Sequence, residues 1–161
     1  MLFLVTISSL GQERTFLTET EFNNILVDGV KWIDIDETLG KVDGMKNLFG
    51  SSINYQIGIE PDPSIGFWDK GFYFDFQEGG DGEYELFHFS IDDNLSSITI
   101  KGVTVTIGDS IHNLSGININ SYQDGSSGVI FVENGSGSDG LFIKYNPSTF
   151  KITEIEYNLF D

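Results

Sequence analysis

Two histidines and many carboxylates are the side chains that could perform chemistry in this chain. Nucleophilic catalysis needs a nucleophile beside an oriented base, and the chain has no cysteine. His88 lies in an alternating strand pattern and His112 near an expected helix start, with no glycine-serine elbow beside either. His88 therefore fits a structural role, and neither a phosphate loop nor a dinucleotide fingerprint occurs. We expect no enzyme and no cofactor.

The acidic clusters resemble calcium loops only in part. Calcium takes about six to eight oxygen ligands, which a carboxylate-rich chain could supply. The segment 34–40 begins like a helix-flanked calcium loop but has Leu39 where glycine is required. The segment 79–84 resembles one turn of a glycine-rich calcium repeat but has Tyr84 where aspartate is expected. We therefore predict no metal site, with a calcium- or carbohydrate-binding β module as the alternative.

Paired carboxylates could also hydrolyse glycosides, but the acids are too abundant for one pair to stand out. A hydrolase of this kind would need a deep cleft holding two acids with separated pKa values. It remains a rival of another class.

Net charge is the strongest global signal. The chain has 25 Asp and Glu against 8 Lys and Arg, for a formal charge of −17. Such a surface repels nucleic acid and anionic membranes and favours a basic protein partner, whose approach the long-range field would steer. The alternative is that the charge only maintains solubility or reflects a salty habitat.

Aromatic residues alternate with acids over the middle of the chain, a composition suited to a Lys- and Arg-rich partner. About two thirds of these aromatics should be core. The predicted partner-binding residues are Trp68, Asp69, Tyr73, Asp75, Asp81, Glu83 and Tyr84.

The elements that position these residues are short strands with a few short helices, so the predicted fold class is α+β, mainly antiparallel. Thr18 and Glu21 form a capping-box pattern for a helix that Gly29 would close. A short or broken helix is expected within 36–49, and at most two turns at Ile111 and Leu114. Strands are expected at 2–8, 30–35, 52–59, 65–68, 71–77, 83–91, 97–107, 117–122, 129–133, 141–145 and 150–159.

A looser copy of the stretch 97–161 precedes it at 29–92. The matching runs are offset by 73, 69 and about 66 residues: 28–39 matches 101–111, 71–74 matches 140–143, and 85–91 matches 151–157. The pattern allows two tandem repeats of a helix and four strands. We predict halves 1–93 and 94–161, packed as one compact unit.

A short helical segment followed by a four-stranded meander, occurring twice, resembles the tandem architecture of β-lactamase inhibitor proteins. The run Val105–Ile111 resembles the small outer-membrane assembly lipoprotein modules. The chain departs from the inhibitor family in lacking its disulfides. Small size and acidity are also similar to bacterial immunity proteins. These resemblances imply an inhibitor or immunity protein that occludes a basic toxin or enzyme.

The first twelve residues favour a strand at Leu2–Ser8 over the end of a secretion signal, because a basic start is missing. A cytoplasmic location is therefore favoured. If residues 1–12 are a trimmed signal, the protein is secreted or periplasmic, and a secreted structural module is a further alternative. We expect a monomer, or a homodimer formed through an exposed edge strand.

Overall fold

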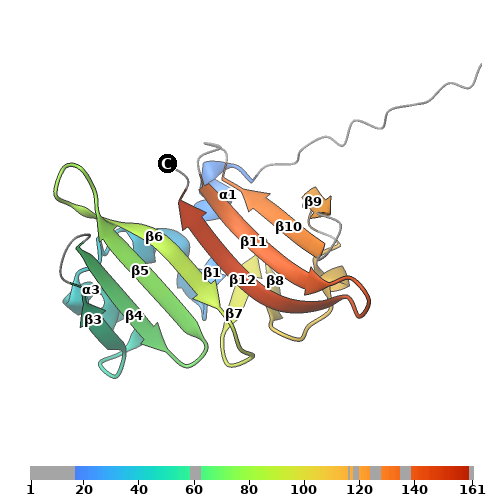
Figure 1. Ribbon diagram of the computed structural model, residues 1–161, viewed down its shortest axis with the longest axis horizontal. Coiled ribbons are helices and arrows are strands. Elements are labelled where there is room, and N and C mark those ends of the chain that lie inside the picture. Colours follow the sequence, from blue (N-terminus) through green and yellow to red (C-terminus); the bar gives the residue numbers. More distant parts are fainter. Residues whose placement is uncertain are drawn as a thin grey trace, which may run out of the picture.

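The computed structural model describes residues 17–58, 63–115, 117, 120–123, 128–134 and 139–159. The fold is α+β and mainly antiparallel β-sheet with few short helices, as predicted. An eight-stranded sheet has the order β3-β4-β5-β6-β12-β11-β10-β9, and a four-stranded sheet the order β2-β1-β7-β8. In Figure 1 the helices and the small sheet lie behind the large sheet.

The elements have the following bounds. The large sheet consists of β3 (Asn54–Ile57), β4 (Ser64–Asp69), β5 (Phe72–Glu78), β6 (Tyr84–Ile91), β9 (Asn120–Gln123), β10 (Gly128–Glu133), β11 (Asp139–Asn146) and β12 (Lys151–Leu159). The small sheet consists of β1 (Leu26–Val27), β2 (Val30–Lys31), β7 (Ser97–Ile100) and β8 (Val103–Thr106). The helices are α1 (Glu19–Asn23), α2 (Trp32–Asp36), α3 (Val42–Phe49) and the 3₁₀ turn η1 (Ile111–Leu114).

The strand order of each sheet is symmetric. Read from one edge, the large sheet runs β3-β4-β5-β6, and read from the other edge it runs β9-β10-β11-β12; the small sheet has β2-β1 on one side and β8-β7 on the other. The large sheet is two four-stranded meanders, a β3–β6 half and a β9–β12 half, joined where β6 pairs with β12. In the small sheet, β1 pairs with β7, and each continues through a two-residue hairpin turn. The turn residues 28–29 and 101–102 all have positive φ, as a type I′ turn requires.

Each half of the large sheet also contains a bulge at the same place. Between β5 and β6, Asp75 pairs with His88 but the next pair is Phe76 with Leu86, so Phe87 is an extra residue. Between β11 and β12, Lys144 pairs with Glu154 and Tyr145 with Ile152, so Thr153 is the extra one. An extra residue strengthens the local twist and tilts the strand that carries it.

The core lies between the two sheets and is rich in aromatic rings. Trp32 of α2 is buried in it, with its ring centroid 5.5 Å from that of Phe89 and 4.7 Å from that of Tyr157. Phe89 and Tyr157 are cross-strand partners where β6 meets β12. The indole therefore closes the junction of the two halves from the core side.

Three expectations about the elements are wrong. The predicted strand 30–35 is only two residues long, because the chain turns into α2 at Trp32, whose amide donates to the Ile25 carbonyl. Trp32 and Ile35, three apart, are buried on one helical face, which explains the apolar content that alternation had assigned to a strand. The predicted strand 97–107 is a hairpin, broken at the turn 101–102.

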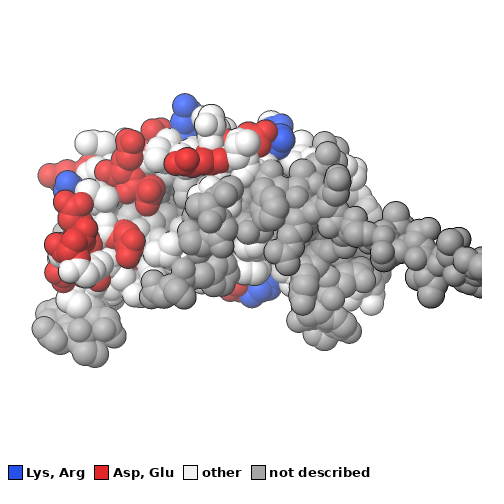
Figure 2. All heavy atoms as spheres, turned by 90° about the horizontal axis from the view of Figure 1, so that it is seen from above, with Lys and Arg blue, Asp and Glu red and all other residues white. Residues whose placement is uncertain are grey.

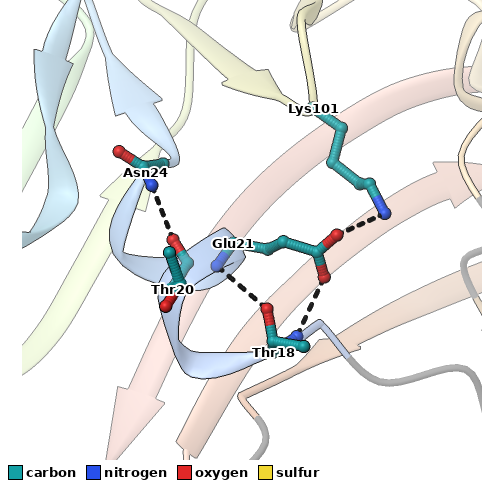
Figure 3. Close-up of polar contacts among 5 residues, drawn as sticks. All are labelled: Thr18, Thr20, Glu21, Asn24 and Lys101. Atoms are coloured by element: carbon teal, nitrogen blue, oxygen red, sulfur yellow. Dashed lines mark hydrogen bonds and ion pairs between the residues drawn. The ribbon is translucent and has the colours of Figure 1, made fainter.

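The third error concerns the end of the first helix. α1 ends at Asn23, while Gly29 lies in the β1–β2 turn and does not cap it. The capping box is confirmed: Thr18 Oγ1 accepts from the Glu21 amide at 3.2 Å, and Glu21 Oε2 accepts from the Thr18 amide at 3.0 Å (Figure 3). The short helix within 36–49 is confirmed as α3, and the turn at Ile111 and Leu114 as η1.

The predicted strand Leu2–Ser8, with the possible signal at 1–12, lies outside the described residues. Within the part of the chain that is described, no helix has the length and apolar content needed to cross a bilayer.

Candidate functional site: the open sheet face and the hairpin groove

The large sheet has one face packed on the core and one facing outward, which we call the open face. Alternation along each strand divides the side chains: Phe72, Phe74 and Phe76 of β5 are buried, whereas Tyr73 and Asp75 between them point outward. The strand register also places outward-facing side chains of neighbouring strands beside one another, and these side chains form one row across most of the large sheet. Its members are Asn54, Trp68, Tyr73, Ser90, Glu156, Phe142 and Phe131.

The β3–β6 half of this row presents exposed aromatic surface. Trp68 and Tyr73 are cross-strand partners and both are 37% exposed. The Tyr73 hydroxyl donates to Asp75 Oδ1 at 3.5 Å, and the Gln77 amide donates to Asp75 Oδ2 at 3.0 Å. Burial, and then the adjacent Asp75 carboxylate, raises the pKa of Tyr73, so its hydroxyl stays protonated. Asp75 thus has two neutral hydrogen-bond donors, Tyr73 and Gln77, as neighbours on the open face.

A glycine lies under an aromatic ring in each half of the face. A Cβ atom on Gly66 would lie 2.8 Å from the Tyr73 hydroxyl oxygen, and one on Gly140 only 2.6 Å from the Phe131 ring. The missing side chains let Tyr73 and Phe131 lie down across the neighbouring strand. Phe131 also contacts Phe142, with 4.7 Å between ring centroids. The row is therefore aromatic at Trp68 and Tyr73 in one half and at Phe142 and Phe131 in the other.

The centre of the open face is polar and charged. Lys144 Nζ lies 2.9 Å from Glu154 Oε2 and 2.6 Å from Glu156 Oε2. His88 Nδ1 lies 2.9 Å from Asn158 Oδ1 on the adjacent strand, across the junction of the two halves. The centre therefore combines two carboxylates, one ammonium group and one imidazole.

The pKa values at the centre reflect this crowding. The hydrogen bond with Glu156, and then burial, raises the pKa of Glu154. Burial would raise the pKa of Glu156 too, but hydrogen bonds from Glu154 and Lys144 outweigh it and lower that pKa. Burial lowers the pKa of Lys144 less than the hydrogen bonds to both glutamates raise it, so the lysine stays charged. The divided carboxyl pKa values satisfy one requirement of the rival hydrolase, but the acids lie on an open sheet face and are held by a lysine.

A second concave feature lies at the β5–β6 hairpin. Two adjoining hollows of about 410 and 320 Å³ separate the hairpin from the turn between α2 and α3. Leu39 and Tyr84 line both, while Asp81 and Glu85 line the larger and Val42 the smaller. Figure 2 shows acidic side chains gathered at the end of the molecule that carries β3 and α3 in Figure 1.

The predicted partner-binding residues fall into two groups. Trp68, Tyr73 and Asp75 lie together on the open face, whereas Asp81, Glu83 and Tyr84 line the hairpin hollows. Asp69 belongs to neither group, because strand alternation places it on the core side at the end of β4. The prediction grouped these residues because they are close in sequence, but the alternation of side chains along the strands places them on different surfaces.

Sequence reasoning missed the contribution of the β9–β12 half. Lys144, Glu154 and Glu156 join the face only because β12 pairs with β6, a contact between residues more than 60 positions apart. The available signal was alternation in 151–159, where Glu154 and Glu156 follow one parity after the bulge.

Among the described residues, no three acidic, histidine or cysteine side chains gather as metal ligands would. The arrangement can bind a partner: its exposed rings supply apolar contact area, and its carboxylates accept hydrogen bonds from cations.

Comparison with known proteins gives no family. No family model matches the chain, and no curated protein matches it. A solved structure with a partly similar fold is an extracellular protein containing an SCP domain from Bacillus anthracis str. Ames, with a TM-score of 0.38 and 8% identity. The match covers 74% of this chain and 43% of that protein, so the chain spans less than half of its length. At this similarity nothing about function follows.

Proposed function

We propose that this chain is a non-enzymatic binding protein of the inhibitor or immunity type, whose open face covers a basic surface of a toxin or enzyme. The observation that carries the proposal is the pair Trp68 and Tyr73, exposed side by side next to the Asp75 carboxylate. Large rings on a rigid strand give contact area at little cost in conformational entropy. Acids beside the rings select a cationic partner.

The size of the face supports the same proposal. From Trp68 in β4 to Phe131 in β10 the row crosses six strands, or about 24 Å at the usual spacing of about 4.8 Å. That width suits an ordinary protein interface, with aromatic anchors at both ends and carboxylates between. The formal charge of −17 would accelerate the encounter with a basic partner.

The proposal includes two like halves, the organisation that the offsets in the sequence predicted. Three features support it: the palindromic strand order, the paired I′ turns and the paired bulges. Asp75 and Lys144 before the bulges are 69 residues apart, and the extra residues Phe87 and Thr153 are 66 apart, the offsets found in the sequence. Kinship with the inhibitor family remains part of the proposal.

The test is differential capture followed by measured affinity. Immobilised wild-type protein and Trp68→Ala are exposed to the same bacterial extract, and a protein retained only by the wild type is purified. We expect it to be basic, to lose at least about tenfold in affinity with Trp68→Ala, and to associate more slowly as salt rises. Its own activity should be blocked at one-to-one stoichiometry.

Tyr55→Ala is the matched control, because Tyr55 is 43% exposed but lies on the edge strand β3 with the opposite parity to the open face. Equal losses with Tyr55→Ala and Trp68→Ala would show that the open face has no special part in binding. A protein that binds both immobilised forms equally, or a Trp68 emission change with glycans and none with basic proteins, would overturn the proposal.

A further inference from the structure

Lys144 holds an unusual position on the open face, because it neutralises carboxylates that a basic partner would need. Its ammonium group contacts both Glu154 and Glu156, while its side chain is only 33% exposed. The Glu156 side chain is 21% exposed beneath it, less than Glu154 at 37%. The lysine therefore covers the carboxylate that lies in the middle of the row.

The surroundings of Lys144 resemble what a partner's cation would meet. In the row, Glu156 lies between Ser90 and Phe142, and the rings of Phe142 and Phe131 adjoin on one side. An acid beside aromatic rings is a favourable environment for a guanidinium group, which pairs with carboxylates through two hydrogen bonds and stacks on rings. The chain fills that environment with its own lysine.

We infer that Lys144 is an internal stand-in for a Lys or Arg side chain of the partner, and that docking exchanges the two cations at Glu154 and Glu156. This inference rests on the proposed function and specifies one subsite of it. The exchange leaves no carboxylate unpaired in the complex, whereas covering Glu156 without a cation would leave a buried charge unsatisfied. In the free protein, Lys144 keeps two adjacent carboxylates from repelling each other.

The contrast with Asp75 supports the exchange. Asp75 accepts hydrogen bonds from the neutral Tyr73 and Gln77, so an incoming cation can bind it directly. At Glu156 the same cation must first displace Lys144. A lysine placed there lowers the affinity for weakly cationic proteins and favours partners with a well-aligned guanidinium group.

The test removes the charge of Lys144 while keeping its aliphatic stem. Lys144→Met, wild type and the control Lys151→Met are titrated with a tetra-arginine peptide and with any partner captured as above. Lys151 is exposed at the start of β12, so its variant reports the effect of losing one positive charge in general. We expect Lys144→Met to bind about tenfold more tightly than wild type, the gain typical of one close charge pair, and Lys151→Met to gain less than about threefold.

Glu156→Gln should change the affinity for the peptide in the opposite direction to Lys144→Met. In the Lys144→Met background it should remove the gain, because the freed carboxylate is what the peptide binds. In the wild type, NMR of the Lys144 ammonium group should show that it loses its ion pairs with Glu154 and Glu156 as peptide is added. Urea unfolding of each variant separates a change in affinity from a change in stability.

The outcomes distinguish the two proposals. If peptide and partner bind but Lys144→Met gains no more than Lys151→Met, or binds more weakly, the exchange is wrong and the proposed function stands. Retention of the Lys144 pairing in the saturated complex would also overturn the exchange. If neither the peptide nor any basic protein binds even at low salt, the proposed function falls and the exchange falls with it.

Discussion

The two halves of the large sheet share a backbone plan but have opposite charges at matching places. In the β3–β6 half, the last pair before the bulge is Asp75 of β5 with His88 of β6. In the β9–β12 half, the last pair before the bulge is Lys144 of β11 with Glu154 of β12. The first half leaves its carboxylate among neutral donors, and the second neutralises two carboxylates with a lysine. Backbone geometry is therefore set by main-chain pairing and buried rings, while the outward side chains can differ between the halves.

The strongest test of the comparison removes what the halves share. Trp32 contacts Phe89 of one half and Tyr157 of the other, and only 3% of it is exposed. Trp32→Ala should lower the free energy of unfolding by about 3–5 kcal/mol, as for other large aromatic truncations in a core. Urea denaturation followed by circular dichroism measures it.

Trp68→Ala serves as the control for that measurement, since Trp68 is on the open face, and it should cost less than about 1 kcal/mol. Two separate transitions in Trp32→Ala would show halves able to unfold alone. A loss near that of the Trp68 variant would mean that the indole does not hold the junction together.

The glycines under the rings sharpen the comparison at a smaller scale. A Cβ at Gly140 would meet both the Phe131 ring and, at 2.7 Å, the Val132 carbonyl oxygen, which cannot move away freely. A Cβ at Gly66 would meet the outer end of the half-exposed Tyr73. Gly140→Ala should therefore cost about 1–3 kcal/mol and Gly66→Ala less than about 1 kcal/mol, by thermal unfolding of both. Equal costs would show that the ring of Phe131 yields as readily as that of Tyr73.

Local pattern predicted much of this fold. Period-two alternation identified β3 and β6, turn residues delimited β4 and β5, and the Thr18–Glu21 spacing identified the start of α1, because all of these signals depend on neighbours in sequence. Trp32 was misassigned because its helix has five residues and forms only by packing against the sheet. The turn at Lys101 and Gly102 was missed because alternation continues through both strands of the hairpin.

The site was less predictable than the fold. The mixture of aromatic and acidic residues grouped Trp68, Tyr73 and Asp75, which share one face, and strand alternation could have excluded Asp69 from that face. Lys144 and Glu156 could not be added, because no local signal says that β12 pairs with β6 rather than with another edge. Long-range register decides which charges meet, and it is set by the shared core.

The pH dependence of stability tests whether Lys144 neutralises the two glutamates of the β9–β12 half. A carboxyl whose folded pKa is lowered, as in Glu156, stabilises the fold above its ordinary value of 4.5 and loses that contribution as pH falls. Glu154, with a raised pKa, acts oppositely and costs stability as pH rises above 4.5. In Lys144→Met both pKa values should be raised, so the stability deficit of the variant should grow from pH 4 towards pH 7, read by urea unfolding at each pH. A deficit that is constant with pH, or shared by Lys151→Met, would show that Lys144 does not hold the two glutamates.

The smallest expected effect concerns the hairpin turns at 28–29 and 101–102, where segments far apart in the sequence meet. Asp28 Oδ1 accepts from the Ser97 amide at 2.7 Å, and Lys101 Nζ lies 2.8 Å from Glu21 Oε1 (Figure 3). The Lys101 hydrogen bond, and then the Thr18 amide, lowers the pKa of Glu21 to about 2.

Lys101→Met should move that pKa part of the way back towards 4.5, because the Thr18 amide still donates, and NMR titration of the Glu21 carboxyl would measure it. Since Lys101 and Glu21 pair at the surface, where solvent screens the interaction, we expect no measurable change in unfolding at pH 7, and any loss should disappear as pH falls from 4.5 to 2, where the wild-type carboxylate is also protonated. With Lys70→Met as the control, a Glu21 pKa that stays near 2 in Lys101→Met would mean that the capping box alone sets it and that this turn, unlike the one at Asp28, does not link two distant segments of the chain.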